Sequence, residues 1–239
     1  MNNLPDLPSL EPVPTAAERA ATLIREYIFE GKFQPGTALP EAAIAAALHV
    51  SRNTVREAYR TLMNEHLLAY SPHKGVTVRW LTPDDVRDIY SLRRLLESAA
   101  IGRLEDGAAL DPAPLTAAVE EGQAAQAARD WQHVGTANLR FHAAIVAVLG
   151  SVRTNEFFAR LMTELRLGFL AVSDPAEFHG GFLAQNRSLL DLLSAGRLGE
   201  ARTLLEQYLS DAENPVIEAV SASDPTLTQN ENTLQFSCD

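Results

Sequence analysis

Three arginines at four-residue intervals raise the first question about chemistry. They are Arg52, Arg56 and Arg60, in the segment VSRNTVREAYRTL that begins at Val50. At about 100° per residue, their side chains fall near 0°, 40° and 80° around a helix. The apolar side chains of the segment fall between about 240° and 300° on the same helix, and they are Val55, Ala58 and Leu62. The spacing predicts a helix with one basic face and one buried face.

The basic face is suited to binding double-stranded DNA. The major groove of B-DNA admits one α-helix, and guanidinium groups can contact guanine O6 and N7 or clamp phosphates. Arg52 and Arg56 are the candidates for these contacts. The residues at the start of the helix, Ser51, Asn53 and Thr54, are short enough to bring backbone amides close to a phosphate strand.

Neighbouring elements predict how this helix is positioned. Ser51 can cap the helix, because its hydroxyl can accept hydrogen bonds from the unpaired amides of the first turn. A short Ala-rich helix at 41–48 precedes it, and only His49 and Val50 separate the two. Two short helices with so tight a link predict a helix-turn-helix. An amphipathic helix over 16–30, ending at Gly31, comes before this pair.

A basic hairpin is predicted to follow the helix-turn-helix. Strand-like runs at 67–70 and 76–80 flank the turn SPHKG, which begins at Ser71. His73 and Lys74 lie at the tip of this hairpin and can reach a neighbouring groove. A competing interpretation is a solvated helix face in which Arg56 or Arg60 pairs with Glu57 or another acid. The cap, the preceding helix and the basic wing together favour the DNA-binding interpretation.

Size and composition place this unit within a two-part, mostly helical chain. The 239 residues suffice for two domains. Aromatic residues make up only 7% of the chain, which favours helices over sheets. The net charge is −11, but residues 1–80 are neutral and residues 81–239 carry all of the excess acid. An acidic average therefore does not exclude DNA binding by the first part.

The second part is predicted to be an antiparallel all-helical bundle. Thr82 can cap a helix that begins at Pro83, which marks the domain boundary. Helices are expected at about 83–106, 113–128, 130–149, 152–172, 181–194 and 198–211. The expected domains are a disordered arm at 1–14, a winged helix-turn-helix at 15–80, an effector-binding and dimerisation domain at 81–213, and a polar tail at 214–239.

Several function classes are not supported by the sequence. The single cysteine, Cys238, permits neither an intrachain disulfide nor a thiolate metal cluster, which suits a reducing cytoplasm. No signal peptide and no apolar run of membrane-spanning length are present, so no membrane partner is expected. The sequence contains neither a glycine-rich phosphate loop nor a nucleophile beside a base, so it does not suggest an enzyme.

The first part resembles the GntR family of bacterial transcription regulators over residues 16–80. The resemblance rests on GKFQPGTAL from Gly31, VSRNTVREA from Val50, LMNEHLL from Leu62 and HKGVTV from His73. It implies that the following residues lie at the DNA: Ser51, Arg52, Thr54, Arg56, Lys74 and Gly75. Many relatives carry an arginine where this chain has Ala42, so one DNA contact of the family is expected to be missing.

The second part resembles the helical FCD domain of the FadR-type branch over about 82–211. The resemblance rests on DIYSLRRLLESAA from Asp88, NLRFH from Asn138, QNRSLLDLL from Gln185, and 196–209. In many relatives an aspartate and three histidines hold a divalent metal there. Those positions are Asn138, His142, Asn186 and Tyr208 in this chain. Because three of the four strong ligands are replaced, no functional metal and no other cofactor is expected, although asparagine and water could complete a weak site.

The same positions could instead bind an effector directly. Asn138, His142, Asn186 and Tyr208 offer donors and acceptors, and Arg93 can clamp a carboxylate or a phosphate. In the alternative interpretation, these four residues satisfy one another in the core and Arg93 pairs with Glu97. His133 and His179 match no ligand position, and surface or loop roles are expected for both.

These observations predict a homodimeric, effector-controlled transcription regulator that binds a double-stranded DNA operator. The resemblance implies a repressor more often than an activator. A dimer would place two recognition helices on a two-fold symmetric site, and 81–85 would couple the bundle to them. The alternative function is a winged-helix module that binds protein and no specific DNA.

Overall fold

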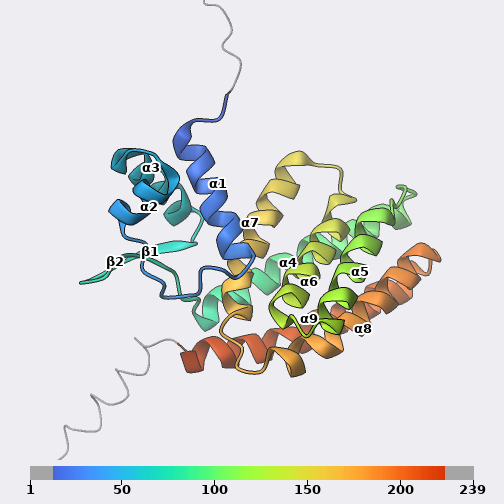
Figure 1. Ribbon diagram of the computed structural model, residues 1–239. Helices are drawn as coiled ribbons and strands as arrows, with labels where there is room; N and C mark the ends of the chain where they lie inside the picture. The colour runs from blue at the N-terminus through green and yellow to red at the C-terminus, as the bar shows by residue number, and fades with distance from the viewer. Residues whose placement is uncertain (1–12, 224–239) are drawn as a thin grey trace, which may run out of the picture.

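The computed structural model describes residues 13–223, which form a small N-terminal unit beside a larger helical bundle (Figure 1). The small unit holds three helices and a two-stranded antiparallel hairpin. Their bounds are α1 (Ala16–Phe29), α2 (Glu41–Leu48), α3 (Arg52–Asn64), β1 (Leu68–Ser71) and β2 (Gly75–Val78). The bundle holds α4 (Pro83–Glu105), α5 (Ala113–Ala127), α6 (Trp131–Ala147), α7 (Val152–Phe169), α8 (Pro175–Ser194) and α9 (Leu198–Ser223). The predicted mostly α fold, a winged helix-turn-helix followed by a bundle, is confirmed.

Local sequence signals explain where the helices of the small unit begin and end. The Ser51 hydroxyl accepts a hydrogen bond from the Thr54 amide at 3.1 Å, so Ser51 is the predicted cap of α3. His49 ends α2 in the left-handed region, with φ of 53°. Gly31, with φ of 72°, follows the C-terminal cap of α1. These two turns fix the angles at which α2 and α3 leave their neighbours.

The apolar face of α3 lies in the core, as its spacing predicted. Val55, Ala58 and Leu62 are each 0% exposed. They belong to one cluster with Ile24 and Ile28 of α1. Burying these side chains orients the opposite, basic face of α3 toward solvent.

Two predictions about the bundle are wrong. Helix α8 begins at Pro175 instead of near 181, because the Asp174 carboxylate accepts a hydrogen bond from the Glu177 amide at 2.9 Å and starts the helix earlier. Helix α9 continues through Pro215 to Ser223 instead of ending near 211. A proline removes one helical hydrogen bond, and burial of the following turn on α7 offsets that loss. The predicted tail is therefore helical over 214–223, while 224–239 and most of the predicted arm, 1–12, lie outside the described residues.

The linker between the two units is fixed by charge. Thr82 and Asp85 form a capping box at the start of α4, as the sequence predicted for Thr82. Arg79, just after β2, donates to both Asp85 oxygens at 2.8 Å and to Glu164 of α7 at 3.2 Å. The wing is thereby tied to two bundle helices.

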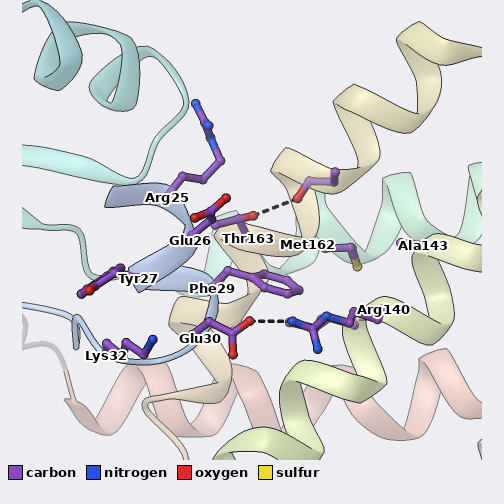
Figure 2. A pocket seen from close by; sticks show the side chains of 12 residues that line it. Arg25, Glu26, Tyr27, Phe29, Glu30, Lys32, Arg140, Ala143, Met162 and Thr163 are labelled. Atoms are coloured by element: carbon purple, nitrogen blue, oxygen red, sulfur yellow. Dashed lines mark hydrogen bonds and ion pairs between the residues drawn. The ribbon is translucent and has the colours of Figure 1, made fainter. Parts of the chain in front are cut away.

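A second seam joins α1 to α6 and α7, and it contains an open pocket of about 650 Å³ (Figure 2). Arg140 of α6 donates to Glu30 at 2.5 Å across this seam. The apolar part of the pocket lining consists of Phe29, Leu139, Ala143, Ala159 and Met162. Within the part of the chain that the structure describes, no helix has both the length and the apolar character needed to cross a membrane.

Candidate DNA-binding surface and buried polar cluster

The outer face of α3 carries exposed arginines. Arg52, Arg56 and Arg60 are all exposed, and so are Ser51 and Asn53 at the start of the helix. Arg56 is 53% exposed in its side chain, and its Nε donates to Glu41 Oε2 at 2.8 Å. Among residues 13–223, no ion pair is found for Arg52 or Arg60.

The pair of Arg56 with an acid partly matches the competing interpretation of a solvated face. Its partner is Glu41 of the preceding helix, not Glu57. An exposed pair of this kind is weakened by solvent and salt, so a phosphate or a guanine can displace it at small cost. The pair therefore does not fix Arg56 in one position.

The hairpin presents its basic tip away from the bundle (Figure 1). Strand β1 pairs with β2 from Leu68 opposite Val78 to Ser71 opposite Gly75. His73 and Lys74 are exposed at the turn, and Gly75 has φ of 76°. A side chain on Gly75 would meet nothing within 4 Å, so this glycine is required by backbone conformation and not by space. The predicted DNA-contacting residues thus lie on two exposed elements of one unit.

The predicted effector residues meet inside the bundle. Asn138 Oδ1, from α6, accepts hydrogen bonds from Asn186 Nδ2 of α8 at 2.7 Å and from the Tyr208 hydroxyl of α9 at 2.8 Å. The His142 ring lies 4.7 Å from the Tyr208 ring, between centroids. All four side chains are buried, which agrees with the alternative in which they satisfy one another.

Glu97 of α4 joins this group to Arg93. Arg93 Nε donates to Glu97 Oε1 at 2.9 Å, and His142 Nδ1 lies 2.6 Å from Glu97 Oε2. These three side chains are at most 1% exposed. The spacing of four on α4 suggested the first contact, but the contact with His142 joins residues 45 apart and no sequence pattern indicated it. The polar cluster of the bundle therefore has six members: Arg93, Glu97, Asn138, His142, Asn186 and Tyr208.

Burial and charge determine the protonation states in the polar cluster. Burial lowers the pKa of His142, and the nearby Glu97 offsets only part of this effect. The ring is therefore neutral at pH 7, with Nδ1 donating to Glu97 and Nε2 left as an acceptor. Burial opposes ionisation of Glu97, but His142 and Arg93 outweigh it and hold the pKa of Glu97 below its ordinary value. Arg93 and Glu97 then cancel in charge.

Three buried polar atoms of the cluster have no partner within residues 13–223. They are Arg93 Nη2, His142 Nε2 and Asn186 Oδ1, which provide one donor and two acceptors. An unsatisfied buried polar group costs about 1–3 kcal/mol. A partner that reached these atoms would recover that cost, so they are the part of the cluster whose hydrogen-bonding capacity is unused.

The residues present do not fit the metal of the family. Asn138 Oδ1 already accepts two hydrogen bonds, and burial raises the pKa of Tyr208, which keeps its hydroxyl protonated. His142 Nε2 is the one strong ligand with an open lone pair at these four positions. No group of three His, Cys, Asp or Glu residues suited to a metal occurs in the described span 13–223.

The two other bundle histidines differ from each other. His133 is 38% exposed, and its Nε2 lies 2.7 Å from Glu121. The expectation of a surface or loop role for His179 is wrong, because His179 is 2% exposed and lies against Phe169 and Phe178. The early start of α8 explains the error, since the segment before Gly180 was expected to be a loop.

Comparison with known proteins decides the family. Residues 16–78 match the bacterial regulatory proteins of the gntR family, and residues 88–211 match the FCD domain. The chain belongs to the GntR family. It is therefore a DNA-binding transcription regulator with an FCD domain, and the family consists of regulators, not enzymes.

Individual relatives support this placement. A GntR transcriptional regulator structure from Rhodococcus sp. RHA1 is 37% identical, covers 85% of this chain and 98% of its own, and superimposes with a TM-score of 0.79. An HTH-type transcriptional regulator of Streptomyces ambofaciens is 28% identical over 215 residues, 85% of this chain and 86% of the relative. The gluconate operon transcriptional repressor of Bacillus subtilis is 38% identical over 86 residues, about a third of each chain (36% and 35%).

Proposed function

We propose that this GntR protein is a homodimeric repressor whose operator binding is controlled by a small-molecule effector in the bundle. The observation that carries the DNA half of the proposal is the exposed basic face of α3 beside the exposed tip of the wing. A repressor named for the gluconate operon lies among its relatives. A homodimer would present two α3 helices to a two-fold operator.

The polar cluster is the proposed effector site. Arg93, Asn138, His142, Asn186 and Tyr208 are its candidate contacts, and the three unpartnered atoms favour a ligand that supplies both acceptors and donors. Glu97 already neutralises Arg93, so a simple anion would compete with a buried carboxylate. A small acid that also bears a hydroxyl fits better, because its carboxylate can accept from Arg93 Nη2 while its hydroxyl donates to His142 Nε2.

Effector binding is proposed to need no resident metal in this member of the family. The support is the donor set described above, in which two amides and a phenol replace the family's carboxylate and two histidines. Elemental analysis of protein purified without chelator tests this directly. Less than about 0.1 equivalent of zinc, nickel or manganese per chain is expected, and one equivalent would contradict the proposal.

Control requires that the effector favour one of two arrangements of the domains. Helix α6 carries Asn138 and His142 and also lies against the seam with α1. A change in the polar cluster can therefore alter how the small unit sits on the bundle, which would mis-space two recognition helices in a dimer.

Footprinting on the protein's own genomic neighbourhood tests the DNA half of the proposal. The expected result is a protected sequence with two-fold symmetry. Once that sequence is known, a thermal-shift screen of hydroxylated acids against their non-hydroxylated analogues tests the effector half, because a ligand raises the melting temperature of the state it binds. No protected sequence would favour the alternative of a protein-binding module.

A further inference from the structure

Helix α1 ends at the boundary between the two domains, and its own last turn supplies no positive charge there. Its last turn contains no basic residue, so the negative end of its dipole is not compensated locally. The amides of Gly31 and Lys32 satisfy the carbonyls of Ile28 and Tyr27. The Phe29 carbonyl lies one residue further on and needs a donor from elsewhere.

The bundle supplies that donor. Arg166 Nε of α7 donates to the Phe29 carbonyl at 3.1 Å. The Thr136 hydroxyl of α6 lies 3.3 Å from the same oxygen and 3.3 Å from the Gln132 carbonyl, and its one proton is shared between them. Arg166 Nη2 also donates to the Gln132 carbonyl at 2.8 Å. We call the contact of Arg166 and Thr136 with the Phe29 carbonyl the interdomain cap. In it, side chains of the bundle satisfy the last unpaired carbonyl of a helix in the other domain.

Arg166 is a buried cation without a carboxylate partner. It is 1% exposed, and no ion pair to it occurs among residues 13–223. Burial lowers its pKa to about 10, with Glu30 and Asp130 opposing the shift. The guanidinium is charged at pH 7 and is stabilised by backbone carbonyls at the negative end of α1. A buried charge held in this way has few alternative positions.

Two glycines, one from each domain, make room for the guanidinium. A Cβ on Gly31 would lie 2.9 Å from Arg166 Nη2, and the φ of 72° at Gly31 also disfavours a side chain. A Cβ on Gly135 would lie 2.7 Å from Arg166 Nη1 and 2.8 Å from His179 Nε2. The space around Arg166 is therefore formed by both domains and closes only when they are docked as observed.

We propose that Arg166 is a positioning residue that fixes the DNA-binding domain on the bundle by capping α1 across the domain boundary. Helix α6 contributes Gln132, Gly135 and Thr136 to this contact and carries Asn138 of the polar cluster two residues later. The interdomain cap is thereby the point at which a shift of α6 reaches the recognition helix. The docking itself does not depend on the proposed function, whereas its effect on operator spacing does.

The first test measures docking in the full chain without DNA. Spin labels at Thr61→Cys in α3 and Glu120→Cys in α5, both exposed, are placed in a Cys238→Ser background and diluted with unlabelled protein. Double electron–electron resonance should give one narrow interdomain distance for the parent. The control Arg153→Met, which replaces an exposed arginine of α7, should give the same distance. Arg166→Met should broaden or shift it. An unchanged narrow distance in Arg166→Met would overturn the proposal.

The second test measures how operator affinity depends on the spacing between half-sites. A residue that only stabilises the fold would not change this dependence. Inserting one base pair between half-sites moves the second by about 3.4 Å and turns it by about 34°. The parent and Arg153→Met should lose about tenfold or more in affinity on this insertion, and Arg166→Met less than about threefold. Arg166→Lys, which keeps the charge, should regain part of the discrimination. Equal spacing penalties in all variants would contradict the proposal.

A folding defect in Arg166→Met would be recognised from the bundle's thermal transition. Thr136→Val then replaces it, since that change removes one donor to Phe29 without changing side-chain size. A broader distance distribution is expected there too, and a parent-like distribution in both Thr136→Val and Arg166→Lys refutes the cap. If the chain bound no DNA, the spacing test would give no signal while the distance test would still report on docking, so failure of the proposed function is distinguished from failure of this inference.

Discussion

The small domain and the bundle use arginine in opposite ways. On α3, Arg52 and Arg60 extend into solvent without an ion pair in the described chain, and Arg56 has only an exposed one. In the bundle, Arg93 and Arg166 are each 1% exposed and held in fixed contacts. An exposed guanidinium is available to a partner and costs little to redirect, whereas a buried one stabilises a particular arrangement. The same residue type is thus proposed to serve recognition in one domain and positioning in the other.

The largest expected effect follows from removing the carboxylate at the centre of the bundle. Glu97→Ala leaves Arg93 buried without its counter-charge and should lower the free energy of unfolding by about 3–5 kcal/mol. Glu105→Ala, on the same helix but in an exposed pair with Arg202, should change it by less than about 1 kcal/mol. Urea denaturation measures both. Equal losses of unfolding free energy in the two variants would show that Glu97 does not compensate a buried charge.

A smaller loss is expected when one hydrogen bond of the polar cluster is removed. Tyr208→Phe deletes the bond to Asn138 and should cost about 1–2 kcal/mol of unfolding free energy. Tyr70→Phe is the control, since Tyr70 is 73% exposed on β1. Urea denaturation at pH 7 compares the two, and a Tyr208→Phe variant as stable as the control would contradict the assignment.

The pH dependence of stability should report on His179. Burial first, and then Arg166, lowers its pKa from 6.5 to about 3. Below pH 6.5 the unfolded chain binds a proton that the folded chain does not, so stability falls as pH drops from 6.5 toward 3, by at most about 1.4 kcal/mol per unit. His179→Gln should reduce this slope, and His142, whose pKa burial also lowers, contributes to the part that remains. The control His133→Gln, at a side chain that is 38% exposed, should leave it in place.

If both variants keep the parent slope between pH 6.5 and 4.5, His179 is not buried in solution as the structure has it.

The smallest effect concerns the pair that holds Arg56. Glu41→Ala frees Arg56 and should raise operator affinity by about two- to fivefold, because an exposed ion pair competes only weakly with a phosphate. Glu57→Ala removes an exposed acid from α3 itself and controls for the change in net charge. Fluorescence anisotropy at fixed salt distinguishes them. A fall in affinity for Glu41→Ala alone would mean that Glu41 orients Arg56 toward the DNA.

The fold of the small domain could be predicted because its signals are local. The alternation of Arg52 and Arg56 with Val55 and Ala58 determines which face of α3 is buried, and Ser51 determines where α3 begins. The start of α8 also has a local signal, the cap Asp174, which the prediction missed, and the end of α9 has none that overrides Pro215. Pro215 is an adequate stop in isolation, and it is overridden by the burial of Val216 and Val220 on α7.

The bundle's polar contacts could be predicted only in part. The family resemblance identified four positions that do meet, Asn138, His142, Asn186 and Tyr208. The sequence indicated Glu97 only as a partner for Arg93, and it gave no indication of a role for Arg166. Both make contacts over long sequence separations, 45 residues to His142 and 137 residues to Phe29, for which a single sequence carries no periodic signal.

The salt dependence of operator binding tests most directly whether the exposed arginines are the ones that meet DNA. The account predicts that Arg52→Ala combined with Arg56→Ala reduces affinity at least about a hundredfold and lowers the slope of log affinity against log salt by up to about 1.8, or about 0.9 for each phosphate that the variant no longer neutralises. Arg153→Ala, an exposed arginine of the bundle, should leave both quantities unchanged. An operator affinity and salt slope equal to those of the parent in the double variant would contradict the account.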